Sequence, residues 1–419
     1  MNIDLKQYTT PCVCGREHSL LTREILIEAG AINRLEGIVR SLELDNRGCV
    51  VCDTNTRPYA RRAAQVLAVH LLDGKSIVEL NANGLHADEK ATAALSAALP
   101  DNTGWLLAVG SGTIHDTTRY IANQRGIPFV SFPTAATVDG FVSTVSAMTW
   151  HGFKTTLPGV SPLAVVADTD IFAAAPYHLT AAGIGDVLGK YTSLCDWEIG
   201  HLVTGEDFCP RIAAITRAAA DNVRDNLAAI RAGSPEDLEK LMFALLLSGI
   251  GIQMWGTSRP ASGAEHHLSH LWEMEILNPR LDALHGEKVG VGLGLALTEY
   301  KRVAALPEIR MKSDYTGLPL DLIEEKFGRL SPEVVKENTP DPLAEVDPVK
   351  LQAALPRVRQ LLAALPDPED IAGEMQQAGC HTRLSQIGLP DSIVHDSLCL
   401  SPFVRYRLTF MRLRKLLDI

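Results

Sequence analysis

Histidines at helical spacing are the clearest candidates for chemistry in this sequence. The run from residue 262 to 285 reads SGAEHHLSHLWEMEILNPRLDALH. On a helix, His266 and His270 share a face because they are four residues apart. His285 precedes a glycine, and Asp186 lies upstream in AAGIGDVLGK. Asp186, His266 and His285 together would bind a divalent metal and leave a position open for a substrate oxygen or water. If these three residues bind a metal, His270 is expected beside the metal or near the cofactor. The alternative is that the histidines are ordinary packed or surface residues.

A glycine turn suggests a phosphate-binding site. AVGSGTIHD contains Gly110, Ser111, Gly112, Thr113 and Asp116, and it connects an apolar strand to a helix. Glycines let the backbone approach a phosphate, and the helix N-terminus offers free N–H groups with a partial positive charge. The turn lacks the G-x-G-x-x-G spacing of the Rossmann fingerprint and does not follow the first strand.

Upstream, Asp53 ends the strand candidate GCVVCD, where a carboxylate can bind an adenosine ribose hydroxyl and favour NAD over NADP. A plain turn cap explains Asp53 equally well. Further candidates follow the strand at 127–132. Thr134, Thr137 and Ser143 are candidates to bind the cofactor, Asp139 to bind a substrate hydroxyl, and Lys154 to meet a carbonyl or phosphate.

The chain starts with another group of possible ligands, Cys12, Cys14 and His18 in CVCGREH. All three are zinc-ligand types, but the usual C-x-x-C spacing and a nearby fourth ligand are missing. A surface hairpin with incidental thiols is the favoured interpretation, and a metal site stays open as the alternative.

The elements that position these residues fall into two parts. Between about residues 24 and 130, strand candidates at 48–52, 76–80, 105–110 and 127–132 alternate with helix candidates at 58–72, 87–99 and 113–124. This alternation predicts a mostly parallel sheet covered by helices. Beyond about residue 170 the pattern is helical, at 179–200, 212–232, 235–256, 264–275 and 287–302. We predict an α/β domain at 1–174 that binds the dinucleotide and an all-α domain at 175–419 that binds metal and substrate. A terminal helix is predicted at 402–417, and a solvated face is the favoured interpretation of its basic residues. An anionic partner is the alternative for this group, which consists of Arg405, Arg407, Arg412, Arg414 and Lys415.

Composition excludes several classes of protein. The chain has 419 residues, a net charge of −11 and 46% hydrophobic residues, so it is globular and has no basic surface for nucleic acid. We expect no signal peptide and no membrane span, and we read 241–252 as a buried helix. Eight cysteines without a disulfide framework favour a reduced, cytoplasmic protein.

Six motifs follow one another along the chain, namely VGSGTIHDTTRY, FPTAATVDGFVS, ADTDIFAAAP, AAGIGDVLGKYTSLCDW, SRPASGAEHHLSH and LHGEKVGVG. Together they resemble the sn-glycerol-1-phosphate dehydrogenase family. The C-terminal SLCLSPFVRYRLTFMRLRKLLD resembles the end of that family, and the CVCGREH start and the length favour its bacterial branch. This family belongs to the superfamily of iron-containing alcohol dehydrogenases and dehydroquinate synthase. Two departures are a Gly-Ser-Gly turn in place of three glycines and His115 in place of a smaller polar residue.

The resemblance implies NAD(P)-dependent interconversion of dihydroxyacetone phosphate and sn-glycerol 1-phosphate. It places the metal ligands on Asp186, His266 and His285, and zinc, nickel or iron as the metal. The metal is expected to act as a Lewis acid on the substrate oxygen, with His270 or water relaying the proton. Arg259, Lys154 and Lys190 are candidates for the substrate phosphate. Rival functions are a polyol dehydrogenase, a dehydroquinate synthase-like cyclase and, less favoured, a non-catalytic scaffold. We expect a homo-oligomer.

Overall fold

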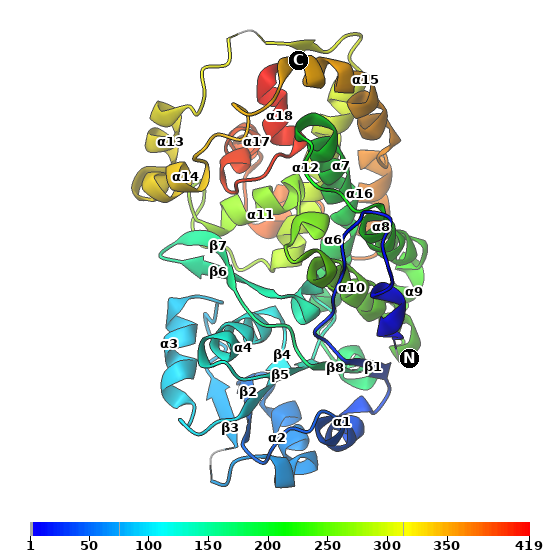
Figure 1. The fold of residues 1–419 in the computed structure, drawn as a ribbon, viewed down its shortest axis with the longest axis vertical. Coiled ribbons are helices and arrows are strands. Elements are labelled where there is room, and N and C mark those ends of the chain that lie inside the picture. Colours follow the sequence, from blue (N-terminus) through cyan, green and yellow to red (C-terminus); the bar gives the residue numbers. More distant parts are fainter. Residues whose placement is uncertain (1–2, 75, 313) are drawn as a thin grey trace.

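The computed structural model describes residues 3–74, 76–312 and 314–419, and the first part of the chain is built on a parallel sheet (Figure 1). Six strands pair in parallel in the order β1-β8-β5-β4-β2-β3. Their bounds are β1 (Glu24–Glu28), β2 (Gly48–Asp53), β3 (Ile77–Leu80), β4 (Trp105–Gly110), β5 (Phe129–Pro133) and β8 (Ala164–Asp168). The predicted α/β architecture of this part is confirmed.

Helices cover both faces of this sheet, as the apolar side chains require. The helices are α1 (Leu35–Ser41), α2 (Arg57–Val66), α3 (Glu89–Ala98) and α4 (Gly112–Arg125). Successive residues of a strand point to opposite faces. Cys49 and Val51 of β2 accordingly belong to one apolar cluster, and Val50 and Cys52 belong to the other. The strands are therefore continuous apolar runs, as is typical of buried parallel strands.

An antiparallel hairpin that the sequence pattern did not predict leaves the sheet after β5. It consists of β6 (Val145–Trp150) and β7 (Phe153–Pro158). His151 and Gly152 form its two-residue turn, both with positive φ (52° and 83°). Turns of this kind match the twist of the flanking strands. The hairpin brings Lys154 of β7 opposite Thr149 of β6.

From α5 (Thr169–Ala173) onward the chain is helical, as predicted. The larger helices are α6 (Tyr177–Leu188), α7 (Lys190–Thr204), α8 (Pro210–Asp225), α9 (Leu227–Ala232), α10 (Pro235–Trp255), α11 (Ala264–Glu273), α12 (His285–Ala304), α13 (Leu320–Phe327), α14 (Ser331–Glu337), α15 (Pro348–Ala364), α16 (Pro368–Gln377) and α17 (Val394–Leu400). The strands β9 (Arg310–Met311) and β10 (Leu417–Asp418) form a two-residue pairing within this region. The domain boundary at residue 174 falls between α5 and α6 and stays a prediction.

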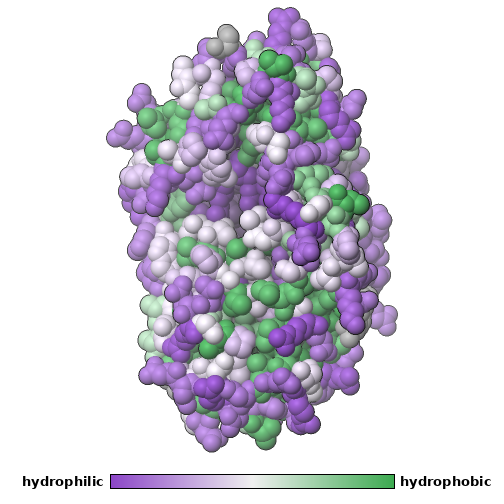
Figure 2. All heavy atoms as spheres, in the orientation of Figure 1, coloured by the Kyte–Doolittle hydropathy of each residue, from purple (hydrophilic) through white to green (hydrophobic). Residues whose placement is uncertain are grey.

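Helix α10 is the centre of the helical region. It has the length and hydropathy of a membrane span, but 78% of its most apolar window is buried inside the protein. Ser234 caps its start by accepting the N–H of Asp237, and Gly256 ends it with φ of 84°. The predicted buried helix is confirmed. On the face seen in Figure 2, hydrophilic side chains predominate and hydrophobic ones form separate patches.

The predicted terminal helix at 402–417 is wrong. Only Phe410–Leu413 is α-helical there (α18), flanked by short 3-10 turns. Its basic residues are not a solvated face either, since Arg412 is 1% exposed and donates to Asn338. A buried arginine requires such partners because an uncompensated charge is expensive inside a protein. The periodicity could not reveal that this segment folds back into the core.

Candidate metal and cofactor site

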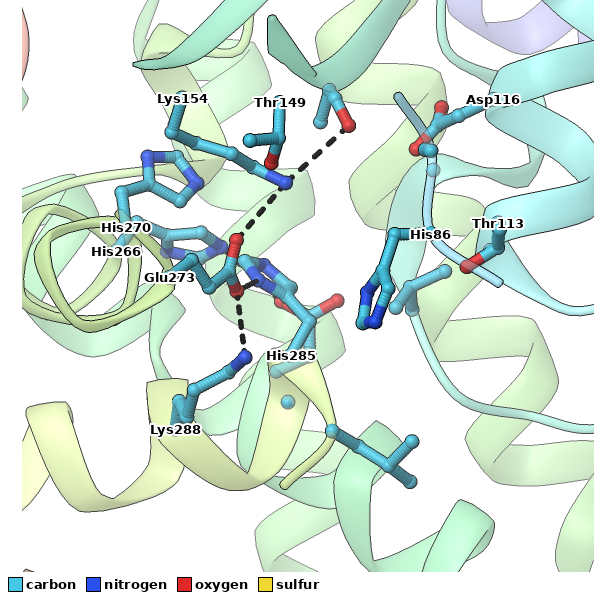
Figure 3. Close-up of a pocket in the computed structure, with 18 of the residues that line it drawn as sticks. His86, Thr113, Asp116, Thr149, Lys154, His266, His270, Glu273, His285 and Lys288 are labelled. Atoms are coloured by element: carbon cyan, nitrogen blue, oxygen red, sulfur yellow. Dashed lines mark hydrogen bonds and ion pairs between the residues drawn. The ribbon is translucent and has the colours of Figure 1, made fainter. Parts of the chain in front are cut away.

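A cavity of about 450 Å³ lies where the carboxyl ends of the strands meet the helical region. Its walls come from both parts of the chain. Figure 3 shows His266, His270, Glu273 and His285 facing His86, Thr113 and Asp116 across the opening. Ligands of open α/β sheets bind in a crevice at this edge.

Asp186 of α6, His266 of α11 and His285 of α12 converge in this cavity. One ligand atom from each lies within 4.8 Å of the other two. The His266 and His285 ring centroids are 5.3 Å apart, and Nε2 of His266 is 3.4 Å from Oδ1 of Asp186. One carboxylate and two imidazoles form a donor set that suits zinc or nickel and also iron. The three predicted ligands are therefore brought together and fit a metal ion.

Two carboxylates orient the imidazoles. Nδ1 of His266 lies 2.7 Å from Oε1 of Glu265, and Nδ1 of His285 lies 2.8 Å from Oε1 of Glu273. A carboxylate that accepts a hydrogen bond from Nδ1–H keeps the proton on that nitrogen and leaves the Nε2 lone pair free for a metal. This arrangement is the one that metal-binding histidines use, and it counts against histidines that merely pack.

Close approach of α6 and α12 brings two of the ligands together. A Cβ at Gly185 would lie 2.3 Å from the carbonyl oxygen of Gly286, and a Cβ at Gly286 would lie 2.0 Å from that of Ala182. Only glycine permits such backbone contact at both positions. Because Asp186 and His285 are the adjacent residues, the glycines set the distance between these ligands.

One buried lysine pairs with two carboxylates of the site. Nζ of the fully buried Lys190 lies 2.9 Å from Asp186 and 2.9 Å from Asp139. Burial opposes the charge on Asp186, but the positive charge of Lys190 outweighs it and holds the pKa of Asp186 below its usual range. Asp186 is therefore ionised, as a metal ligand must be.

His270, Glu273 and His285 form a second possible ligand group that shares one histidine with the first. Glu273 is already bound to Lys154 at 2.9 Å and to Lys288 at 3.2 Å. Burial lowers the pKa of His270 well below its usual value, so this imidazole is neutral, and its Nδ1 has no partner among the described residues. We favour the Asp186 group because each of its imidazoles has a carboxylate partner at Nδ1, whereas Nδ1 of His270 has none among the described residues.

The glycine turn lies on the other side of the cavity. Gly110 ends β4, Ser111 is the N-cap of α4, and Ser111, Gly112, Thr113 and Asp116 line the cavity. A Cβ at Gly110 would lie 2.7 Å from Ile114, so a glycine allows the tight passage from strand to helix. His115 lies behind the turn, where it donates to Ser111 O and accepts from Ser131. Burial lowers its pKa to about 3, so it braces the turn as a neutral ring.

The other predicted residues divide into two groups. Thr137, Asp139, Ser143, Lys154 and His270 line the cavity. Asp53 and Thr134 do not, and neither do the two phosphate candidates Arg259 and Lys190. Oδ1 of Asp53 accepts the N–H groups of Asn55 and Thr56, as a turn cap does. Its role in ribose binding stays a prediction.

The surroundings of Arg259 and Lys190 argue against either residue as a ligand of the substrate phosphate. Arg259 is 3% exposed and is bound to Glu206 and to the carbonyls of Asp196 and Leu408. Lys190 is enclosed by its two carboxylates. In both cases the pairing that neutralises a buried cation removes it from the substrate.

Several cavity residues were missed by sequence reasoning, namely His86, Glu273, Lys288, Arg405 and Arg407. Glu273 follows His270 by three residues and so lies one helical turn away, a spacing that could have revealed it. Arg405 and Arg407 follow the short turn at 401–403, and only the tertiary fold brings them to the metal ligands.

Comparisons with known proteins extend this description. The model of the iron-containing alcohol dehydrogenase family matches residues 26–176. A glycerol-1-phosphate dehydrogenase [NAD(P)+] of Geobacillus stearothermophilus is 34% identical over 92% of this chain and 91% of its own. The enzyme of that name from Halalkalibacterium halodurans is 33% identical over 97% of this chain and 96% of its own. One from the archaeon Thermococcus kodakarensis is 31% identical over 76% and 87%.

Solved structures show the same fold at lower sequence identity. An iron-containing alcohol dehydrogenase from Corynebacterium glutamicum superposes with a TM-score of 0.62 at 16% identity, covering 94% of this chain and 91% of that one. A glycerol dehydrogenase from Schizosaccharomyces pombe gives 0.54 at 21% identity, covering 92% and 93%. Both likenesses support the arrangement of sheet and helices.

Proposed function

We propose, since the chain belongs to the glycerol-1-phosphate dehydrogenase family, that it interconverts dihydroxyacetone phosphate and sn-glycerol 1-phosphate with NAD(P)H. The observation that carries the proposal is the cavity in which Asp186, His266 and His285 face the glycine turn of α4. In one direction a hydride passes from the nicotinamide to the carbonyl carbon, and a proton is added to the oxygen. The reverse direction returns both.

The N-terminus of α4 would bind the cofactor pyrophosphate. The free N–H groups of its first turn, at Gly112 and Thr113, provide the partial positive charge that a phosphate needs. Thr137, hydrogen-bonded to Ser111 at 2.7 Å, and Ser143 stand beside the turn as further cofactor contacts. Asp53 stays a candidate for the ribose, and the choice between NAD and NADP rests on that residue.

Asp186, His266 and His285 would hold one divalent metal, with zinc, nickel or iron compatible with the donor set. When bound, such an ion supplies Lewis-acid stabilisation of negative charge on the substrate oxygen. The residues around it have separate tasks. Asp139 and Lys190 hold Asp186, and the neutral His270 lines the cavity as the proposed relay for the proton of the substrate oxygen.

The substrate phosphate would lie near Arg405, Lys154 and Lys288. All three line the cavity. The two lysines share one carboxylate, Glu273, so one positive charge is left over between them. The guanidinium of Arg405 has no ion-pair partner among the described residues, and such a group binds a phosphate through two parallel hydrogen bonds.

The polyol dehydrogenase alternative lacks a role for these cations, because glycerol carries no charge.

We further propose that the protein works in the cytoplasm and as a homo-oligomer. None of the eight cysteines forms a disulfide in the part of the chain that the structure describes, which is consistent with a reducing compartment.

The decisive assay follows NADH and NADPH oxidation with dihydroxyacetone phosphate, and in parallel with dihydroxyacetone. The protein is used as isolated, after chelation, and after zinc, nickel or iron is added back. We expect turnover with dihydroxyacetone phosphate. Chelation should abolish this turnover, and adding back one of the metals should restore it. Arg405→Met should raise KM for dihydroxyacetone phosphate by at least about tenfold and leave KM for the cofactor nearly unchanged. Equal turnover of the unphosphorylated ketone would contradict the substrate assignment.

A further inference from the structure

Four potential metal ligands lie together outside the cavity, at the N-terminal segment. They are Cys12, Cys14, His18 and Cys209, and one ligand atom from each lies within 4.8 Å of the others. Cys12 Sγ is 3.4 Å from Cys209 Sγ, and His18 Nε2 is 3.3 Å from Cys14 Sγ and 3.4 Å from Cys209 Sγ. None of the four lines the cavity. Cys209, which lies 191 residues beyond His18, supplies the fourth ligand that the local sequence lacks.

These distances are on the scale of a tetrahedral zinc site. Zinc binds sulfur at about 2.3 Å and nitrogen at about 2.0–2.1 Å, so neighbouring ligand atoms of a tetrahedron lie about 3.5–3.8 Å apart. The observed contacts of 3.3–3.4 Å require only a small opening of the group to receive the ion. Three thiolates and one imidazole form a closed donor set that is typical of structural zinc and leaves no position for a substrate.

The orientation of His18 provides an independent observation. Its ring is 5% exposed, and Nδ1 lies 3.0 Å from the carbonyl oxygen of Met254. A carbonyl only accepts, so Nδ1 carries the proton and Nε2 presents its lone pair to the three sulfurs. Ligating histidines have the same partner at their second nitrogen.

The local chain holds the ligands in place without a metal. Gly15 has φ of 77° and its N–H donates to Cys12 O, which closes a turn that reverses the chain at Val13 and Cys14. Arg16, which follows that turn, pairs with Asp207 and lies over the Trp255 ring at 4.4 Å. Cys209 is the N-cap of α8, close to Asp207 in sequence.

We propose that Cys12, Cys14, His18 and Cys209 bind a structural zinc ion that fastens the N-terminal segment to the helical region. This segment continues into β1 at the edge of the sheet, and in Figure 1 the dark-blue chain lies along the green helices α8 to α10. The ion therefore ties both parts of the molecule together on a side remote from the chemistry. Zinc affinity at this site contributes to the free energy of unfolding.

Cobalt substitution tests the proposal without any assay of turnover. Full-length protein is stripped of metal and loaded with Co²⁺. We expect a thiolate-to-cobalt charge-transfer band in the near ultraviolet, which the cavity site cannot give because it contains no sulfur. The band should be lost in Cys209→Ser and kept in His266→Ala. Serine is a good N-cap, so the first variant keeps the start of α8.

Metal analysis and thermal unfolding complete the test. Cys209→Ser and Cys14→Ser should each contain about one equivalent of zinc less per chain than the wild type. Both should melt at a lower temperature, and chelation, which also removes the cavity metal, should lower the melting temperature of the wild type further than that of either variant. Cys399→Ser, at a cysteine outside the group, is the matched control and should change neither. A wild type without the charge-transfer band, or with a Cys12–Cys209 disulfide in the protein as isolated from reducing cells, would overturn the proposal. Because these readouts are independent of dehydrogenase activity, they stand whether or not the proposed function fails.

Discussion

Gly185→Ala should separate two metal ligands without touching either. The new Cβ would lie 2.3 Å from the carbonyl oxygen of Gly286, whereas ordinary contacts begin near 3.4 Å. Helices α6 and α12 must therefore move apart by about 1 Å, because the atom met is backbone and cannot rotate away. Metal ligands tolerate about 0.2 Å. We expect metal affinity to fall at least about tenfold, turnover about 100-fold, and the free energy of unfolding by about 1–3 kcal/mol.

Chelator competition measures the metal affinity, and circular dichroism with thermal melting shows that the variant is folded. Gly294→Ala is the matched control, because this residue also lies on α12 and a Cβ there would meet nothing within 4 Å. Alanine should stabilise that helix by about 1 kcal/mol and leave the metal in place. The reasoning is refuted if Gly185→Ala binds metal and turns over like the wild type, or if Gly294→Ala loses metal as well.

Three further substitutions probe the site and the core. His266→Ala should lose the cavity metal and the activity but keep cofactor binding, as measured by metal analysis and by NADH fluorescence; normal metal content would remove His266 from the ligand set. Glu273→Gln removes the charge that holds Lys154 and orients His285, so metal affinity should fall about 10–100-fold in the same chelator titration, and an unchanged value would contradict this role. Burial lowers the pKa of Lys415 to about 8 from 10.5. Between these values the unfolded chain binds more protons, so the lysine's cost to folding is fully present below pH 8 and disappears as pH rises toward 10.5. Lys415→Met should therefore stabilise the protein by about 1–3 kcal/mol near neutral pH and by little above about pH 10, as measured by denaturant unfolding at both pH values; equal stability of the two proteins at neutral pH would count against the buried charge.

The sequence could predict the elements because they depend on local periodicity. The strand predicted at 105–110 is β4, and the helix predicted at 235–256 is α10 within one residue. His266 and His285 were found for a similar reason, since helical spacing and an adjoining glycine are local signals. Asp186 was proposed from its place in the turn AAGIGDVLGK, and the resemblance to a family implies a metal ligand at the same position.

Residues that depend on long-range contacts escaped prediction. Cys209 has no ligand-type neighbour at metal-site spacing, yet it completes the group of Cys12, Cys14 and His18. Arg405 was assigned to a solvated helix because basic residues usually lie on such faces. Its true position follows from the packing of the 401–409 segment against α11, and no pattern within that segment reports this packing.

The charges around the cavity explain how a chain with a net charge of −11 can bind anions. Its buried carboxylates are already paired with cations, since Asp186 and Asp139 share Lys190 and Asp116 is bound to Arg119. Arg405 remains without such a partner among the described residues that line the cavity, and so its field acts on whatever enters. Charges on the outer surface are screened within about 8 Å at physiological ionic strength, whereas charges in a partly desolvated cavity are not. The local arrangement, and not the net charge, therefore decides that a phosphorylated ketone and a dinucleotide can occupy this site together.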